Sequence, residues 1–78
     1  MKVQFNSIDQ IESFLNITQR MESDVIIKQG NLQLDGKSSM GMMKIPLNYA
    51  VDVYIIEKRG LNEVGDFIKR CMEINVVV

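Results

Sequence analysis

The chain has 78 residues, carries a net charge of −1 and consists of 46% hydrophobic and 24% charged residues. This balance is that of an ordinary globular protein rather than a disordered or membrane-embedded one, and the length predicts one domain over residues 1–78. Because the lysines and arginines are dispersed, no basic face is available to neutralise the phosphates of a nucleic acid.

The first two predicted elements are a short strand and an amphipathic helix. Residues 2–6 alternate with period two, with Val3 and Phe5 on the apolar side. Ser7 stands three residues before Gln10, which is the spacing of a capping box at a helix start. Such a helix should cover an apolar surface with one stripe of side chains. The residues of the predicted stripe are Ile8, Ile11, Phe14, Leu15, Ile17, Thr18 and Met21.

A hairpin and a short helix are predicted next. Residues 24–28 are rich in β-branched side chains, and after a turn containing glycine the residues 32–34 alternate again. Residues 35–37 form a second turn. The stretch 38–44 is broken by glycine and limited by Pro46, so it can make only one or two helical turns.

The remainder predicts a strand, a helix and an unassigned tail. Residues 50–57 alternate between a face with Val51 and Val53 and a face with Asp52 and Tyr54, as in a strand with one buried side. A last helix begins at residues 61–63. Its predicted apolar stripe consists of Val64, Phe67, Ile68, Cys71 and Met72, and its wet side includes Glu63, Asp66, Lys69 and Arg70.

The elements in the order β-α-β-β-α-β-α predict an α+β fold. A four-stranded, mostly antiparallel sheet with three helices on one face is the economical way to bury the apolar stripes together. The tail of residues 74–78 has strand propensity and could pair with the sheet edge of another chain, but a frayed end is an equal alternative.

The residues do not predict catalysis, a cofactor or a metal site. The chain has no histidine and one cysteine, and it lacks paired carboxylates or a nucleophile with a base at a recognisable spacing. Cys71 falls on an apolar stripe, which favours a buried structural thiol over a reactive one. The first ten residues are unlike a signal peptide or a membrane span, so we expect a cytoplasmic protein.

The segment Asp35-Gly36-Lys37-Ser38-Ser39-Met40-Gly41-Met42-Met43 resembles the HPr family of bacterial phosphotransferase-system (PTS) phosphocarriers. In that family, Lys-Ser-x-Met-Gly-x-Met follows a hairpin and opens a short helix. The order of the predicted elements also fits the family. The resemblance implies an HPr-like open-faced β-sandwich and a relation to a carrier that passes phosphate to sugar permeases.

The carrier chemistry of this family is not expected here. A register based on Phe14 places Ser7 where the family has its phosphorylated histidine, Asp9 where it has an arginine and Gln10 where it has a proline. An imidazole nitrogen attacks readily and leaves readily at neutral pH, whereas a serine phosphate ester does neither. Asp9 would also repel a phosphate. We therefore interpret Ser7 as a helix N-cap and consider a phosphate relay through it remote.

A regulatory feature of the family does carry over, onto Ser38. It aligns with the serine that a dedicated kinase phosphorylates in Gram-positive bacteria to control carbon catabolite repression. The simpler alternative is that Ser38 only caps the short helix, and Ser39, where the family has an apolar residue, could be the cap instead. The surrounding residues that match the family are Lys37, Met40, Gly41 and Met43.

The three clustered methionines predict a protein-binding surface, because methionine adapts to varied partners. The resemblance implies that partners dock here. We expect one or two of the methionines in the core and at most two exposed, with Met42 as the candidate for exposure. The predicted partner-binding residues are Lys37, Ser39, Met40, Met42 and Met43.

The sequence therefore predicts a non-catalytic HPr-like regulatory or interaction module that acts through Ser38. Crh-like members of the family, which also lack the histidine, act in this way as co-regulators of a catabolite repressor. The implied partners are an HPr kinase or a transcriptional regulator, and the expected state is a monomer or weak dimer. The alternative is a partner-binding or structural domain on the same fold that is unrelated to sugar transport. The departures at Ser39 and Asp9 favour this alternative.

Overall fold

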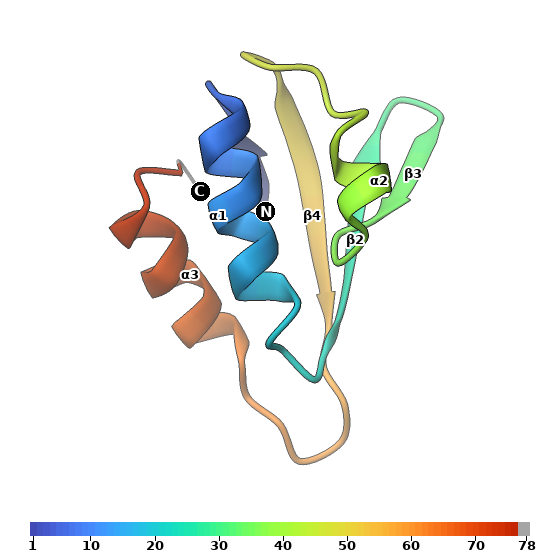
Figure 1. Cartoon of the computed structure of the whole chain (residues 1–78). Coiled ribbons are helices and arrows are strands. Elements are labelled where there is room, and N and C mark those ends of the chain that lie inside the picture. The colour runs from blue at the N-terminus through green and yellow to red at the C-terminus, as the bar shows by residue number, and fades with distance from the viewer. Residues whose placement is uncertain (77–78) are drawn as a thin grey trace.

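The computed structural model describes residues 1–76, which form the predicted order of elements (Figure 1). This confirms the α+β class and the β-α-β-β-α-β-α order. The bounds are β1 Lys2–Gln4, α1 Ile8–Thr18, β2 Asp24–Gln29, β3 Leu32–Asp35, α2 Ser39–Met42, β4 Ala50–Ile56 and α3 Val64–Glu73. No helix within the described residues is long and apolar enough to cross a bilayer.

The four strands form one sheet in the order β1-β4-β2-β3, and every neighbouring pair is antiparallel. The last strand in the sequence, β4, is therefore inserted between β1 and β2. Alternate strand residues, including Val3, Val25, Ile27, Val51 and Val53, are buried on a single face. All three helices contribute to the same core, so they cover that face and leave the other one open (Figure 1).

Three phenylalanines form the centre of the core. The rings of Phe5 and Phe14 pack edge to face with their centroids 5.0 Å apart, and Phe14 and Phe67 do the same at 5.7 Å. All three side chains are fully buried. The Phe14 ring therefore connects the segment after β1 to α3 through α1.

Helix α1 is capped as predicted, with one difference. The Ser7 Oγ accepts a hydrogen bond from the Gln10 backbone N–H (3.2 Å). The Gln10 Oε1 accepts from the N–H of Asn6 (2.6 Å), whereas in a standard capping box the acceptor side chain bonds to the cap residue itself. The predicted stripe is wrong at Ile8, which is exposed, because the core begins one turn further on at Ile11.

Helix α3 begins at Val64, just after the predicted start. Phe67 and Cys71 are buried as predicted, one turn apart on the same side of the helix. Met72 was predicted to join them but is exposed. Met72 lies one turn after the partly buried Ile68 on the same side of the helix, so the core does not extend as far as Met72 near the end of α3.

The tail after α3 is a helix-ending motif, at least as far as Val76. Asn75 has a left-handed backbone (φ 61°), its N–H donates to the Met72 carbonyl (3.1 Å), and the Val76 N–H donates to the Cys71 carbonyl (3.0 Å). This is the Schellman arrangement, and its apolar contact brings the buried Val76 into the core. The expectation of a frayed or edge-pairing tail is therefore wrong at residue 76, while residues 77–78 lie outside the described residues.

Candidate partner-binding site

The loop that precedes α2 is fixed by hydrogen bonds to two other elements. The Gly36 N–H donates to the Val25 carbonyl (2.7 Å) on β2, and the buried Thr18 Oγ1 donates to the Gly36 carbonyl (2.7 Å) from the end of α1. Within the loop, the Ser38 N–H donates to the Asp35 carbonyl (3.0 Å). The loop therefore presents α2 in a defined position.

Close packing explains why residue 36 is a glycine. A Cβ atom placed on Gly36 would lie 2.5 Å from Val25 Cγ1 and 3.1 Å from the Val25 carbonyl oxygen. The first distance is shorter than any normal van der Waals contact and the second is unusually short, so any larger residue would push the loop away from β2. The sequence predicts only that Gly36 lies in a turn, and the close approach to Val25 could not be inferred from it.

Ser38 is the N-cap of α2, and this excludes Ser39 from that role. The Ser38 Oγ accepts a hydrogen bond from the Gly41 N–H (3.1 Å), and its backbone is extended (φ −90°, ψ 118°). Ser39 is exposed, and its Oγ lies 3.3 Å from the Gln19 side-chain amide of α1. Capping does not conflict with modification of Ser38, because the side chain is only half-buried.

One of the three methionines is buried and two are exposed, which agrees with the predicted numbers. The prediction was wrong about which one is exposed, because Met42 is the buried residue. Met42 is fully buried, whereas Met40 is 82% and Met43 is 47% exposed. A helix as short as α2 must bury one side chain to be held in place, and Met42 fills this role in the core. Met42 therefore cannot contact a partner directly, while Met40 and Met43 can.

Lys37 contributes to the folded structure of this region. Its Nζ donates to the Met21 carbonyl (2.7 Å), and its own carbonyl accepts from the Gln19 side-chain amide (3.1 Å). The ammonium group therefore satisfies a carbonyl after the end of α1 instead of extending into solvent. Whether Lys37 also contacts a partner stays a prediction.

A carboxylate near this loop was assigned to the wet side of α3, but it bridges two segments. Glu63 Oε1 accepts hydrogen bonds from both the backbone N–H (2.8 Å) and the hydroxyl (2.5 Å) of the buried Ser23, which precedes β2. These bonds lower the pKa of Glu63 from its usual value, and the positive charge of Lys37 contributes to the same effect. No local pattern signals this contact, because the two residues are far apart in the sequence.

The Glu63 bridge should make stability depend on pH. A carboxylate whose pKa is lowered by folding stabilises the folded state above its usual pKa of 4.5, and this contribution is lost as the pH falls through the lower, folded value. We expect the difference in unfolding free energy between wild type and Glu63→Gln to be constant well above pH 4.5 and to shrink below it. Urea unfolding at a series of pH values measures this, with Glu57→Gln at an exposed position as the control. Parallel pH profiles for wild type and Glu63→Gln would contradict the assignment.

The positions that correspond to the family's carrier signature lie at the other end of α1. Ser7 caps the start of α1, while Thr18 and Gln19 contact the Gly36–Ser39 loop at its end, so roughly 16 Å of helix separate the two regions. Asp9 is exposed in the first turn. The structure therefore does not bring Ser7 and Ser38 into one site.

Cys71 is enclosed in the core. The thiol is fully buried, and burial raises its pKa to about 11. Because the thiolate is the reactive form, this environment keeps the group inert at neutral pH. The prediction of a buried structural thiol is confirmed.

Comparisons with known proteins leave the family open. No protein-family model matches the chain, and no curated protein or solved structure matches it. Among the described residues, no group of three or more Cys, Asp or Glu side chains is placed to hold a metal ion.

Proposed function

We propose that the protein is a non-catalytic HPr-like interaction module that binds protein partners through the exposed face of α2 and is regulated at Ser38. The observation that carries this proposal is the placement of Met40 and Met43. Met40 is exposed on the very short helix α2 and Met43 is exposed at its C-cap, on either side of Met42, which holds that helix in the core. Exposed flexible apolar side chains on a fixed support are suited to docking.

The fixed support matters because binding loses affinity when a loop must be ordered. Hydrogen bonds from Thr18 and to Val25 already hold the loop before α2, and the Gln19 amide lies between the Lys37 carbonyl and the Ser39 hydroxyl. A partner therefore meets the two methionines without ordering the backbone that carries them. The contacts available to it are the apolar side chains themselves and the neighbouring serine.

A phosphate on Ser38 would change the character of this surface. In the described part of the chain, the Ser38 hydroxyl accepts from Gly41 and donates to no protein group, so its proton is free for replacement. Phosphorylation adds about 1.5 to 2 negative charges and three acceptor oxygens. This charge would lie next to the exposed Met40, so the modified and unmodified forms would suit different partners.

The HPr relation is supported by the matched motif and by the arrangement of elements. The Lys37–Met43 segment follows a hairpin and opens a short helix, as the motif does in the HPr family. Ser7 acts as a helix cap, which agrees with the loss of the carrier function. The module would thus keep the family's regulatory serine phosphorylation and lack its transfer of phosphate through a histidine.

The proposal is tested by incubating the purified protein with an HPr kinase and ATP and measuring the intact mass. We expect one added phosphate on wild type and on Ser39→Ala, and none on Ser38→Ala. To test docking, Met40→Glu should slow this labelling, while Met72→Glu, which changes an exposed methionine on α3, should not. Ordinary HPr labelled in the same tube shows that the kinase is active.

The second candidate function is a partner-binding domain unrelated to sugar transport. Two features favour this second function, because both change the surroundings of Ser38. Position 39 is a serine, and the Lys37 ammonium donates a hydrogen bond to the Met21 carbonyl. An unmodified wild-type protein beside a labelled HPr control would select this function. The α2 surface would then remain the docking site, but without kinase control.

A further inference from the structure

The sheet face opposite the helices carries apolar side chains that no described part of the chain covers. Tyr54 and Ile56 on β4 are 47% and 51% exposed, and Ile26 on β2 is half-buried. Ile26 and Tyr54 are directly opposite each other in the β2–β4 register, and Ile56 points to the same side two residues after Tyr54. These three residues, called the open-face strip below, therefore form one apolar surface across two neighbouring strands.

Two carboxylates border the open-face strip. Asp35 on β3 is directly opposite Ile26 in the register, and Asp24 lies two residues before Ile26 on β2, so both point to the open face. Both are exposed, and within residues 1–76 neither forms an ion pair. The Asp35 carboxylate accepts a hydrogen bond from the backbone N–H of Lys37 (2.9 Å), which leaves its charge in place. Two negative charges therefore lie beside Ile26 without a paired cation.

The surface is hollowed in two places next to Ile26. Asp24, Ile26 and Asp35 line a shallow hollow of about 280 Å³. A second hollow, of about 450 Å³, is lined mainly by apolar residues, which include Ile26, Tyr54 and Ile56. Because Ile26 borders both, a hollow with two carboxylates lies next to a largely apolar one.

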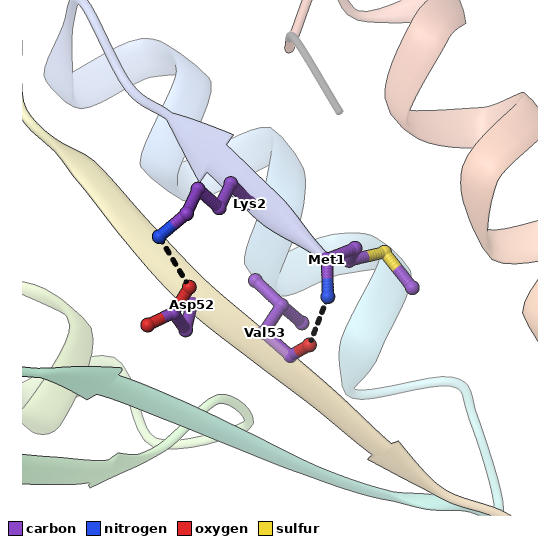
Figure 2. A network of polar contacts seen from close by, with 4 residues as sticks. All are labelled: Met1, Lys2, Asp52 and Val53. Atoms are coloured by element: carbon purple, nitrogen blue, oxygen red, sulfur yellow. Dashed lines mark hydrogen bonds and ion pairs between the residues drawn. The ribbon is translucent and has the colours of Figure 1, made fainter.

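The positive side chains of this face already have neighbours. Figure 2 shows Lys2 on β1 with its ammonium 2.8 Å from Asp52 on β4. Lys28 is opposite Asp52 in the β2–β4 register, and its ammonium lies 5.3 Å from the centre of the Tyr54 ring. The strands thus place three carboxylates and two ammonium groups on the open face, and the excess charge is negative.

We infer that the open-face strip binds an amphipathic helix of another protein, one in which lysine or arginine residues border the apolar stripe. Neighbouring strands lie about 4.8 Å apart, and a helix with its side chains is about 10–12 Å across. One apolar helical stripe therefore covers both β2 and β4, and the basic residues at its border reach Asp24 and Asp35. Burial of apolar area supplies affinity, and the opposite charges select the partner.

Charge disfavours the other occupants of this face. Two open faces carry the same excess of carboxylates, so a second copy of the chain would be repelled. An anionic lipid surface would be repelled for the same reason. The inference goes beyond the proposed function, because the helices lie on the opposite side of the sheet and Ser38 takes no part in it (Figure 1).

Two labelled model helices test the inference. One consists of leucine and lysine and the other of leucine and glutamate, with the same length and the same apolar face. Their binding to the full chain is measured by fluorescence anisotropy at low salt, where surface charges are least screened. Wild type should bind the leucine–lysine helix roughly tenfold or more tightly than the leucine–glutamate helix. The amide chemical shifts of residues 24–28, 33–35 and 52–56 should change on binding.

Charge variants show whether the two carboxylates are responsible. The double variant Asp24→Lys/Asp35→Asn should lose or reverse the preference, and its asparagine keeps an acceptor for the Lys37 N–H. The matched control is Glu12→Lys/Glu73→Gln, which makes the same change in net charge at exposed positions on α1 and α3. This control should keep the preference of wild type.

A second pair of variants tests the apolar contact. Ile56→Thr keeps a β-branched side chain but should weaken binding of the leucine–lysine helix about tenfold, whereas the exposed Met72→Gln on α3 should not change it. Circular dichroism establishes that each variant is folded. Equal binding of the two helices by wild type, a preference that survives in Asp24→Lys/Asp35→Asn, chemical-shift changes on the helical side, or self-association of wild type through this face would each overturn the inference.

Discussion

Replacing Phe14 by alanine is expected to lower the free energy of unfolding by about 3–5 kcal/mol. The Phe14 ring is fully buried and is the only one of the three described core rings that packs against both of the others, at 5.0 Å from Phe5 and 5.7 Å from Phe67. Its removal leaves a cavity between α1 and α3 and takes away both edge-to-face contacts. For a domain whose total stability is on the order of 5 kcal/mol, this loss leaves about 2 kcal/mol or less, so up to half of the molecules would be unfolded in the absence of urea.

Urea denaturation followed by circular dichroism measures this loss. Phe14→Leu is the matched comparison, because it keeps most of the apolar volume and should lose clearly less stability than Phe14→Ala. The exposed Met72→Ala should change the unfolding free energy by no more than about 0.5 kcal/mol. An effect of Phe14→Ala as small as that of Met72→Ala would show that the core is centred elsewhere.

Replacing Gly36 by alanine is expected to destabilise the protein by roughly 2–4 kcal/mol, through overpacking and a lost hydrogen bond. The added methyl group would lie 2.5 Å from Val25 Cγ1. Relieving this clash requires the loop to move away from β2, which stretches the 2.7 Å bond from the Gly36 N–H to the Val25 carbonyl. The nearby Thr18 bond to the Gly36 carbonyl would be disturbed by the same movement.

Gly65→Ala is the matched control, since the residue lies in α3 and a Cβ there meets no atom within 4 Å apart from its chain neighbours and the backbone of its own helix. It should be neutral or stabilising by up to about 1 kcal/mol. The mechanism is checked by a double-mutant cycle, because Val25→Ala removes the Cγ1 atom and should reduce the cost of Gly36→Ala. Equal costs in the two backgrounds would mean that steric contact with the Val25 Cγ1 atom is not the cause.

Most of the fold was predictable because strands and long helices carry their own signal. The alternation in β4 and the periodicity of α1 each specify a buried side over several residues. The errors fall where the signal is short or non-local. Ile8 and Met72 lie at helix ends, where periodicity cannot tell how far the core extends. The buried Val76 was also missed, although Asn75 is a known residue type for the left-handed end of a helix.

The local structure around the candidate site was predictable in outline but not in detail. The Lys37–Met43 motif indicated a loop that opens a short helix, and the serine before that helix indicated the cap at Ser38. Four helical residues are too few to define a face, which is why Met42 was placed outside although it is buried. The Glu63–Ser23 bridge and the Val25–Gly36 contact join distant segments, and no local pattern encodes them.

The position of β4 between β1 and β2 also has a consequence for how the chain folds during synthesis. β1 forms its sheet contacts with β4, so Val3 can pair with Val51 only after β4 has left the ribosome. Until then, the only pair of neighbouring strands available is the β2–β3 hairpin, which is marginal alone. The nascent chain therefore exposes the apolar side of α1 for most of its translation, and a chaperone that shields such surfaces would act before β4 emerges.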